Sequence, residues 1–191
     1  MLLLIDACAR AESRTLPLAE KAAEILTADT GVYTTLHLYD EKDLKPLDRD
    51  ALFLRDSRIE NHDYTDNSFR FAKQFRDADE IIIAAPYWDL SFPAVLKCYI
   101  ESICVNGLTF YYTETGEPKG LCRAKRLIYI TTAGGFIPEN NYGYNYMKQL
   151  CMDYFGIKNT ICVKAEGLDI YGANIPEILA SAELDLKIKL K

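Results

Sequence analysis

The chain has 191 residues, of which 49% are hydrophobic and 26% are charged, and its formal net charge is −6. This composition is close to that of an average globular domain, so it excludes a disordered, collagen-like or low-complexity chain. The acidic balance argues against nucleic acid as the main partner, because phosphate backbones are bound by clustered Lys and Arg. At this length we expect a single domain, residues 1–191, whose core needs no metal or disulfide.

The longest apolar runs, residues 2–5 and 81–86, are too short to span a bilayer. The first residues also lack the basic segment and the cleavage site of a signal peptide. The cysteines form no C-x-x-C pair and have no histidines at zinc-site spacing. We therefore expect a cytoplasmic protein that binds no metal and no membrane, with free thiols at positions 8, 98, 104, 122, 151 and 162.

Apolar strand-like runs alternate with helical periodicity along the whole chain. A strand at 2–7 precedes a helix with apolar residues at 19, 22, 23 and 26, which Gly31 ends before a strand at 32–39. A buried strand at 81–85 precedes a helix with apolar residues at 96, 99, 100 and 103, and Pro93 suits its first turn. A strand at 126–132, a helix at about 144–155 ended by Gly156, a strand at 161–165 and a helix from about 175 to the C-terminus follow.

Two stretches interrupt this pattern. Residues 40–63 are charged, contain Pro46 and have little periodicity, so we expect a long loop, which in a compact domain is usually a lid or an interface element. Residues 110–118 are expected to form two extended pieces around a turn. Both stretches are also compatible with simple surface connections.

The alternation of helices with strands too apolar to be half exposed predicts an α/β fold, a parallel sheet with helices on both faces. Five strands in so short a chain favour the flavodoxin-like doubly wound five-stranded sheet over the six-stranded dinucleotide-binding type. No G-x-G-x-x-G follows the first strand, which also disfavours the dinucleotide type. In such a sheet a ligand binds beyond the carboxyl ends of the strands, so the residues directly after each strand are the functional candidates.

The loop after the first strand concentrates hydrogen-bond donors. It holds two guanidiniums, two hydroxyls and the free N–H groups of a helix N-terminus, in Arg10, Ser13, Arg14 and Thr15. On an otherwise acidic chain this concentration predicts a phosphate site. The alternative is that Ser13 or Thr15 merely caps the helix and the arginines are solvated, and spacing alone does not decide between the two.

Two further loops follow apolar strands. Residues 85–93 bring the only Trp, a Tyr and a Phe to the expected ligand edge, and residues 132–136 include adjacent glycines that let backbone approach a ligand closely. The three loops together would hold a phosphate, a flat aromatic body and polar ring edges. This describes a mononucleotide with a planar head group, and flavin mononucleotide (FMN) fits it better than most. Because a flavin itself carries hydride, we expect no dedicated catalytic side chain, and we expect backbone N–H groups of residues 87–90 to contact the ring.

Longer motifs then carry a resemblance. Residues 85–97 (APYWDLSFPAVLK) and 107–116 (GLTFYYTETG) match the signatures P-x-W/Y-N-F-S-x-P-A-x-L-K and G-x-T-F-x-Y-T-x-x-G, and similarity continues at 132–135, 154–157 and 165–168. The chain resembles the flavodoxin-like NAD(P)H:quinone oxidoreductase and FMN-dependent NADH-azoreductase family over nearly its whole length. The resemblance implies a homodimer with FMN at the subunit interface, and hydride transfer from NADH or NADPH to FMN and then to a quinone or azo compound.

The resemblance also assigns the cofactor-binding residues in three groups. The phosphate would be bound by Arg10, Ser13, Arg14 and Thr15, the ring and ribityl chain by Pro86, Tyr87, Trp88, Asp89 and Leu90, and the pyrimidine edge by Thr132, Ala133, Gly134 and Gly135. Three of these positions depart from the family pattern. Asp89 replaces the usual Asn, Leu90 the usual Phe and Ala133 a common Arg. An ionised Asp89 near the ring would oppose an anionic reduced flavin and lower its reduction potential.

Two other functions remain open: a flavodoxin-type FMN-binding electron carrier without nicotinamide turnover, and a flavin-free binding domain on the same scaffold. The remaining chemically distinctive side chains have ordinary interpretations. His37 and His62 have no partner at ligand spacing, so packing or solvation is expected for both. Cys8 lies beside the phosphate loop, where a helix N-terminus could lower the pKa of its thiol.

Overall fold

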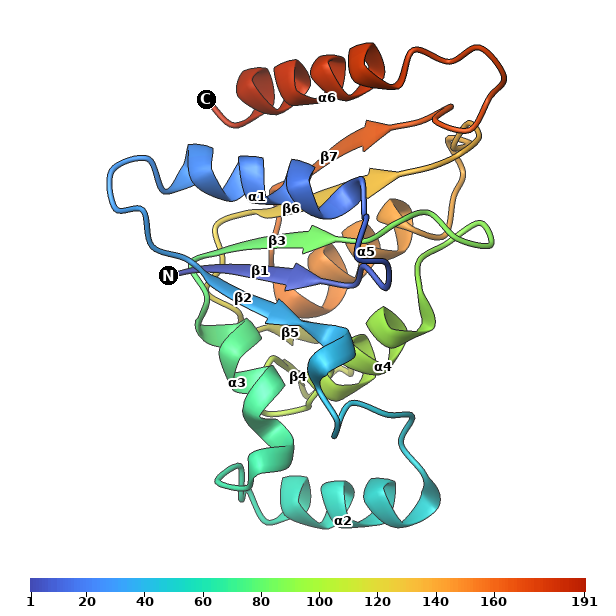
Figure 1. Ribbon diagram of the computed structural model, residues 1–191. Coiled ribbons are helices and arrows are strands. Elements are labelled where there is room, and N and C mark those ends of the chain that lie inside the picture. Colours follow the sequence, from blue (N-terminus) through green and yellow to red (C-terminus); the bar gives the residue numbers. More distant parts are fainter.

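A five-stranded parallel sheet forms the centre of the computed structural model, which describes residues 1–191 (Figure 1). Its strands are β1 (Leu2–Asp6), β2 (Thr34–His37), β3 (Glu80–Ala84), β6 (Leu127–Thr132) and β7 (Thr160–Ala165), in the order β2-β1-β3-β6-β7. Every neighbouring pair is parallel. This confirms the predicted flavodoxin-like doubly wound sheet. From β1 the chain leads to β2 on one side and from β3 to β6 on the other, which leaves a topological switch point between β1 and β3.

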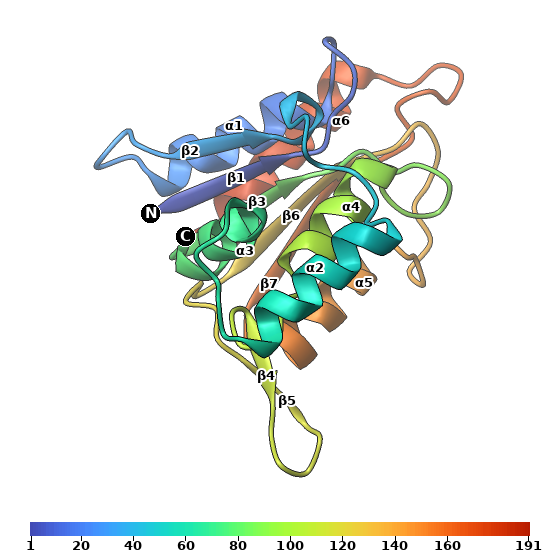
Figure 2. The same ribbon diagram turned by 90° about the horizontal axis from the view of Figure 1, so that it is seen from below.

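Helices cover both faces of the sheet, as Figure 2 shows. On one face, α1 (Thr15–Leu26) and α6 (Ile175–Lys189) belong to the core cluster that holds the even-numbered residues Leu2 and Leu4 of β1. On the other face, α3 (Arg70–Asp77), α4 (Ala94–Ile103) and α5 (Tyr144–Leu150) belong to the cluster that holds its odd-numbered residues Leu3 and Ile5. The side chains of a strand alternate between its two faces, so a strand covered by helices on both sides is apolar throughout. This is why the sequences of β1 and β3 consist mostly of consecutive apolar residues.

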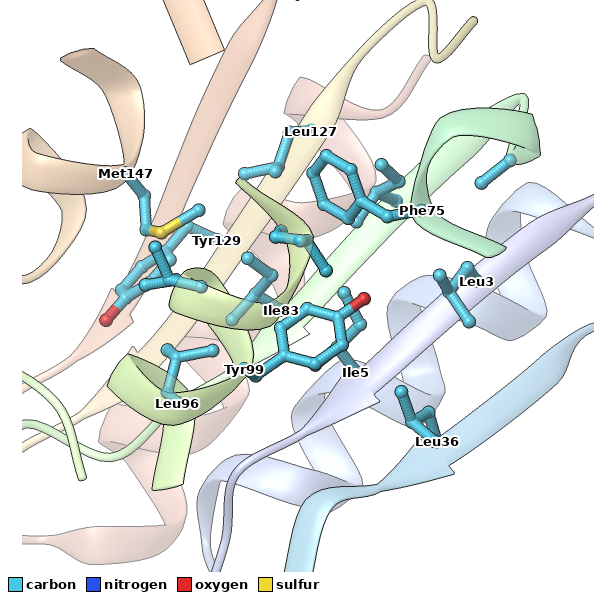
Figure 3. Packing of buried hydrophobic residues seen from close by; sticks show 14 of the residues in the cluster. Leu3, Ile5, Leu36, Phe75, Ile83, Leu96, Tyr99, Leu127, Tyr129 and Met147 are labelled. Atoms are coloured by element: carbon cyan, nitrogen blue, oxygen red, sulfur yellow. The ribbon is translucent and has the colours of Figure 1, made fainter. Parts of the chain in front are cut away.

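The larger of the two main core clusters lies between the sheet and the second group of helices (Figure 3). Phe75 and Tyr99 face each other there with ring centroids 6.4 Å apart, and both are fully buried. Burying a side chain of this size stabilises a fold by roughly 1.5–3 kcal/mol. These contacts fix α3 and α4 against β1 and β3, and so fix the ends of those strands relative to one another.

The region 40–63 is not the loop that the sequence predicts. After a 3-10 turn at Leu38–Asp40, residues Arg49–Glu60 form α2, whose N-terminus is capped by the Asp48 carboxylate accepting from the N–H of Ala51 at 2.9 Å. None of its residues is buried, and the helix lies away from the sheet (Figure 1). Its apolar residues 52–54 are consecutive rather than spaced by three or four, so the periodicity that predicts helices is missing.

Smaller differences concern element ends. The strand predicted at 32–39 is shortened to β2 because the backbone turns into the 3-10 segment η1 at Leu38. Pro93 precedes α4 instead of lying within its first turn.

The helix predicted at 144–155 is α5 followed by a π-helical turn, η3 (Cys151–Phe155), and Gly156 ends it with φ +76° as predicted. Another 3-10 turn, η2 (Asn67–Phe69), leads into α3, a helix that is not predicted from the sequence.

The predicted pair of extended pieces is the hairpin of β4 (Phe110–Tyr112) and β5 (Pro118–Gly120), which are antiparallel. Gly120 packs against the backbone of Phe155 and Gly156, where a Cβ atom would overlap main-chain atoms.

No helix of the structure has both the length and the apolar character needed to cross a membrane.

Candidate functional site

A cavity of about 410 Å³ lies at the carboxyl ends of β1, β3 and β6, beside the switch point of the sheet. Ligand pockets have volumes of roughly 300–1,000 Å³. Ten of the thirteen predicted site residues line it: Arg10, Ser13, Arg14, Thr15, Pro86, Tyr87, Trp88, Thr132, Ala133 and Gly134. Asp89, Leu90 and Gly135 do not line it. The structure thus brings together the three predicted loops, which are far apart in sequence.

The first loop, residues 8–14, connects β1 to α1 and leaves its backbone donors free. None of the N–H groups of residues 9–14 finds an acceptor within the chain. Ser13 Oγ accepts hydrogen bonds from the N–H groups of Thr15 and Leu16, at 3.1 and 3.2 Å. Thr15 Oγ1 lies 2.7 Å from Thr132 Oγ1, which ties α1 to the end of β6. Ser13 therefore does cap the helix, as the alternative interpretation supposed, but the remaining N–H groups still form a concave set of donors.

The two arginines of this loop are not simply solvated. The Arg10 guanidinium lies 6.0 Å from the centroid of the Trp88 ring, within the range of a cation–π contact. Arg14 Nη1 donates to Asp169 Oδ1 at 2.9 Å and to the carbonyl of Leu168 at 3.5 Å. Asp169 follows β7 and lines the cavity together with Glu12. The sequence reasoning missed both carboxylates, and only the pairing of distant loops reveals Asp169.

The second loop is a tight turn. Trp88 and Ser91 exchange two backbone hydrogen bonds, and the residues between them have positive φ angles, +50° at Asp89 and +66° at Leu90. A positive φ angle is unfavourable for a bulky residue such as Leu90, and backbone strain of this kind is found most often at functional sites. The N–H of Tyr87 donates to Thr132 O and that of Trp88 to Ser91 O. Of the four N–H groups expected to face a ring, only those of Asp89 and Leu90 therefore lack an acceptor in the chain.

The third loop continues β6 and is hydrogen-bonded to the loop after β7. The N–H groups of Leu168 and Asp169 donate to the carbonyls of Ala133 and Gly134 at 3.1 and 2.9 Å. A Cβ atom on Gly134 would lie 3.0 Å from Asp169 Cγ and closer still to one carboxylate oxygen, whereas a Cβ on Gly135 would meet open space. The absence of a side chain at Gly134 therefore makes room for Asp169.

A buried carboxylate lies beneath the first loop. Asp6 is 4% exposed; its Oδ1 accepts from the N–H of Cys8 at 2.9 Å and its Oδ2 lies 2.9 Å from His37 Nδ1. Spacing in the sequence does not reveal this contact of His37, which arises because β1 and β2 place Asp6 and His37 side by side in register. The Cys8 thiol does not have the lowered pKa that a helix N-terminus could cause. Burial raises the pKa of Cys8 to about 12, and this desolvation outweighs the lowering by the side chains of Ser13 and Thr15.

Comparison with known proteins places the chain in a family. A family described as having a flavodoxin-like fold matches residues 1–190, and the chain belongs to it. An FMN-dependent NADH:quinone oxidoreductase of Clostridium beijerinckii is 38% identical over 153 residues, which cover 78% of this chain and 74% of that protein. A protein of Clostridium acetobutylicum named FMN-dependent NADH:quinone oxidoreductase 2 is 42% identical over 115 residues, and this chain spans 56% of its length.

Solved structures share the fold at lower identity. An azoreductase from Bacillus anthracis has a TM-score of 0.83 at 23% identity, with 99% of this chain and 97% of that one covered. An FMN-dependent NADH-azoreductase from the same species, solved in complex with FMN, has a TM-score of 0.80 at 21% identity, covering 99% and 97%. At these identities the likeness shows the fold alone.

The residues of the cavity suit FMN. One end offers two guanidiniums and a set of unpaired backbone N–H groups, which are donors of the kind that bind a phosphate. Next to them, Tyr87 and Trp88 supply aromatic walls, and the backbone of residues 132–134 forms the rest of the rim. The departures at Asp89 and Leu90 lie outside the lining of the cavity, and only Ala133 changes one of its walls.

Proposed function

We propose that the protein is an FMN-dependent oxidoreductase that passes hydride from NADH or NADPH to FMN and then to a quinone or an azo compound. One observation carries the proposal: a single cavity at the switch point joins cationic and N–H donors to neighbouring aromatic walls. The family and the names of its quinone-reducing relatives support the same activity.

Each loop has a distinct role in this proposal. Arg10, Arg14 and the free N–H groups of residues 9–14 bind the phosphate, while Ser13 and Thr15 hold the loop and α1 in place. Trp88 and Tyr87 orient the ring, and the N–H groups of Asp89 and Leu90 are donors to its polar edge. Residues 132–135 contact the pyrimidine edge. When bound, FMN supplies the hydride chemistry, so the chain's task is binding and orientation.

Steady-state assays separate this function from the two alternatives. FMN-loaded protein should oxidise NADH or NADPH in the presence of a soluble naphthoquinone, and comparing the two nucleotides gives its preference. Protein that binds FMN but oxidises neither nucleotide is an electron carrier. Purified protein that is colourless and does not quench the fluorescence of added FMN is a flavin-free binding domain, and that result would contradict the cofactor assignment itself.

We further propose a cytoplasmic homodimer in which α2 contributes to the subunit contact. Its side chains of Leu52, Phe53 and Leu54 are 45%, 76% and 49% exposed, and an exposed apolar group of this size is typical of an interaction surface. The unpaired state of all cysteines supports a reducing compartment. Light scattering should give twice the mass of the chain, and Phe53→Asp should shift the protein towards the monomer. A monomeric wild-type protein would overturn this assignment.

A further inference from the structure

The Arg14 guanidinium already has an anionic partner inside the cavity. Its Nη1 lies 2.9 Å from Asp169 Oδ1, and the two side chains are 41% and 70% exposed. An ion pair at this degree of exposure is weak, typically below about 1 kcal/mol, and its members can exchange partners. The Asp169 carboxylate thus occupies a donor that would otherwise face a bound anion.

The position of Asp169 is fixed by the backbone around it. Its N–H donates to Gly134 O at 2.9 Å, and the N–H groups of Gly167 and Leu168 donate to Gly135 O and Ala133 O. Gly134 has no side chain at the point where a Cβ would overlap the carboxylate. The carbonyl of Leu168 also faces Arg14 Nη1. The loop after β7 therefore holds a carboxylate against Arg14 in a defined place.

We propose that Asp169 is a specificity-determining residue that competes with the phosphate of the ligand for Arg14. This inference rests on the proposed FMN-binding function. A carboxylate and a phosphate are alternative partners of one guanidinium. A phosphorylated ligand has to share Arg14 with Asp169 or displace it, so Asp169 weakens the binding of FMN but has no such effect on riboflavin, which has no phosphate.

The test compares FMN and riboflavin on flavin-free protein, with affinity measured by quenching of flavin fluorescence. Asp169→Asn keeps the shape of the side chain and removes its charge. It should bind FMN roughly three- to tenfold more tightly than wild type, while its affinity for riboflavin stays the same. The gain should vanish when Arg14→Ala is also present, because the carboxylate then has no guanidinium to occupy. Asp29→Asn removes the same charge from an exposed turn outside the cavity and should leave both affinities unchanged.

Three results would overturn the inference. FMN affinity that is unchanged or weaker in Asp169→Asn would mean that the carboxylate orients Arg14 for the phosphate or plays no part. Equal changes for FMN and riboflavin would indicate a general effect on the cavity. A gain that persists with Arg14→Ala would place the effect elsewhere. Wild-type protein that binds neither flavin would instead refute the proposed function, and this inference with it.

Discussion

Arg10 and Arg14 are the cationic side chains of the cavity, and each already contacts another side chain of the protein. Arg10 lies against Trp88, and Arg14 is paired with Asp169. Neither contact contributes much to folding, because both arginines are largely in solvent. Their positions are better explained by a ligand that carries negative charge at this end of the cavity.

Replacing Arg10 and Arg14 together by Ala should therefore weaken FMN binding much more than it changes stability. A hydrogen bond to a charged group contributes about 1.5–3 kcal/mol, so the dissociation constant should rise by roughly 100-fold or more. Urea unfolding should show a change in free energy of less than about 1 kcal/mol. Fluorescence titration with FMN makes the measurement. An unchanged affinity would refute the phosphate assignment.

Leu90 adopts a backbone conformation that suits glycine better than leucine. Its φ is +66° and its side chain is 57% exposed, so little packing compensates for the strain. In the left-handed region a residue with a Cβ atom destabilises the folded state by about 1–2 kcal/mol. Glycine avoids this strain, but its unfolded chain has greater conformational entropy, which cancels part of the gain in stability.

Leu90→Gly should accordingly raise the free energy of unfolding of the flavin-free protein by about 0.5–1 kcal/mol. Leu90→Ala is the matched control, because it removes the same exposed side chain but keeps the Cβ that causes the strain. Urea denaturation of the two variants decides the question. Equal stabilities would show that the turn imposes no strain at this position.

At the scale of elements, the sequence predicts the sheet well and the peripheral helices poorly. The strands β1, β3 and β6 contain continuous apolar runs because helices cover both of their faces, and this pattern is visible without a structure. Helix α2 buries no residue, so it leaves no periodic signal, and α3 is only 8 residues long.

The candidate site shows the same contrast between features that the sequence predicts and features that it does not. The loops after β1, β3 and β6 could be predicted because parallel strands deliver their carboxyl ends to one edge. The pair of Arg14 and Asp169 joins positions 155 residues apart, and the pair of Asp6 and His37 depends on the strand register. Neither follows from local spacing, so sequence reasoning identified the walls of the cavity but not the anions around it.

Helix α2 is attached to the body of the protein by hydrogen bonds of Arg55 and by Ile59, which packs against the buried cluster of Phe69, Ala72, Val105 and Leu108. Arg55 donates from Nη1 to the carbonyl of Glu101 at 2.8 Å and from Nη2 to the carbonyl of Cys104 at 2.5 Å. These carbonyls belong to the last turn and the C-cap of α4, where intrahelical donors are missing. The guanidinium thus joins the two helices, which lie side by side in Figure 2.

Arg55→Ala should release α2 without unfolding the domain. Backbone amides of residues 52–60 should exchange with solvent deuterium at least tenfold faster, and the global free energy of unfolding should fall by about 1–3 kcal/mol. Arg49→Ala, at an exposed position on the same helix, is the control and should change neither quantity. Unaltered exchange in Arg55→Ala would show that apolar contacts alone hold the helix.

Across the whole molecule, burial makes the cysteines poor acids. Desolvation raises the pKa of Cys8 and Cys151 to about 12 and that of Cys104 and Cys162 to about 11, from an ordinary value near 9. Between pH 9 and those values the unfolded chain has lost protons that the native protein keeps. Stability contributed by these thiols is therefore complete below about pH 9 and declines as the pH rises.

Each such thiol should lower the free energy of unfolding by about 1.4 kcal/mol per pH unit above 9. Urea unfolding at pH 8, 9 and 10 measures the slope. Cys162→Ala should reduce the dependence of the free energy of unfolding on pH by the contribution of one thiol. This comparison distinguishes the effect of the cysteine from that of other groups that titrate in this range. A slope that is identical in wild type and Cys162→Ala would contradict the raised pKa of Cys162.

We expect a single ligand to contact all three loops, and a crystal structure of the FMN-loaded protein tests this most directly. We expect the phosphate within hydrogen-bond distance of Arg14 and the N–H groups of residues 9–14, the ring against Trp88, and its pyrimidine edge at Gly134. FMN bound at another place on the molecule, or unable to reach Arg14, Trp88 and Gly134 together, would contradict the account.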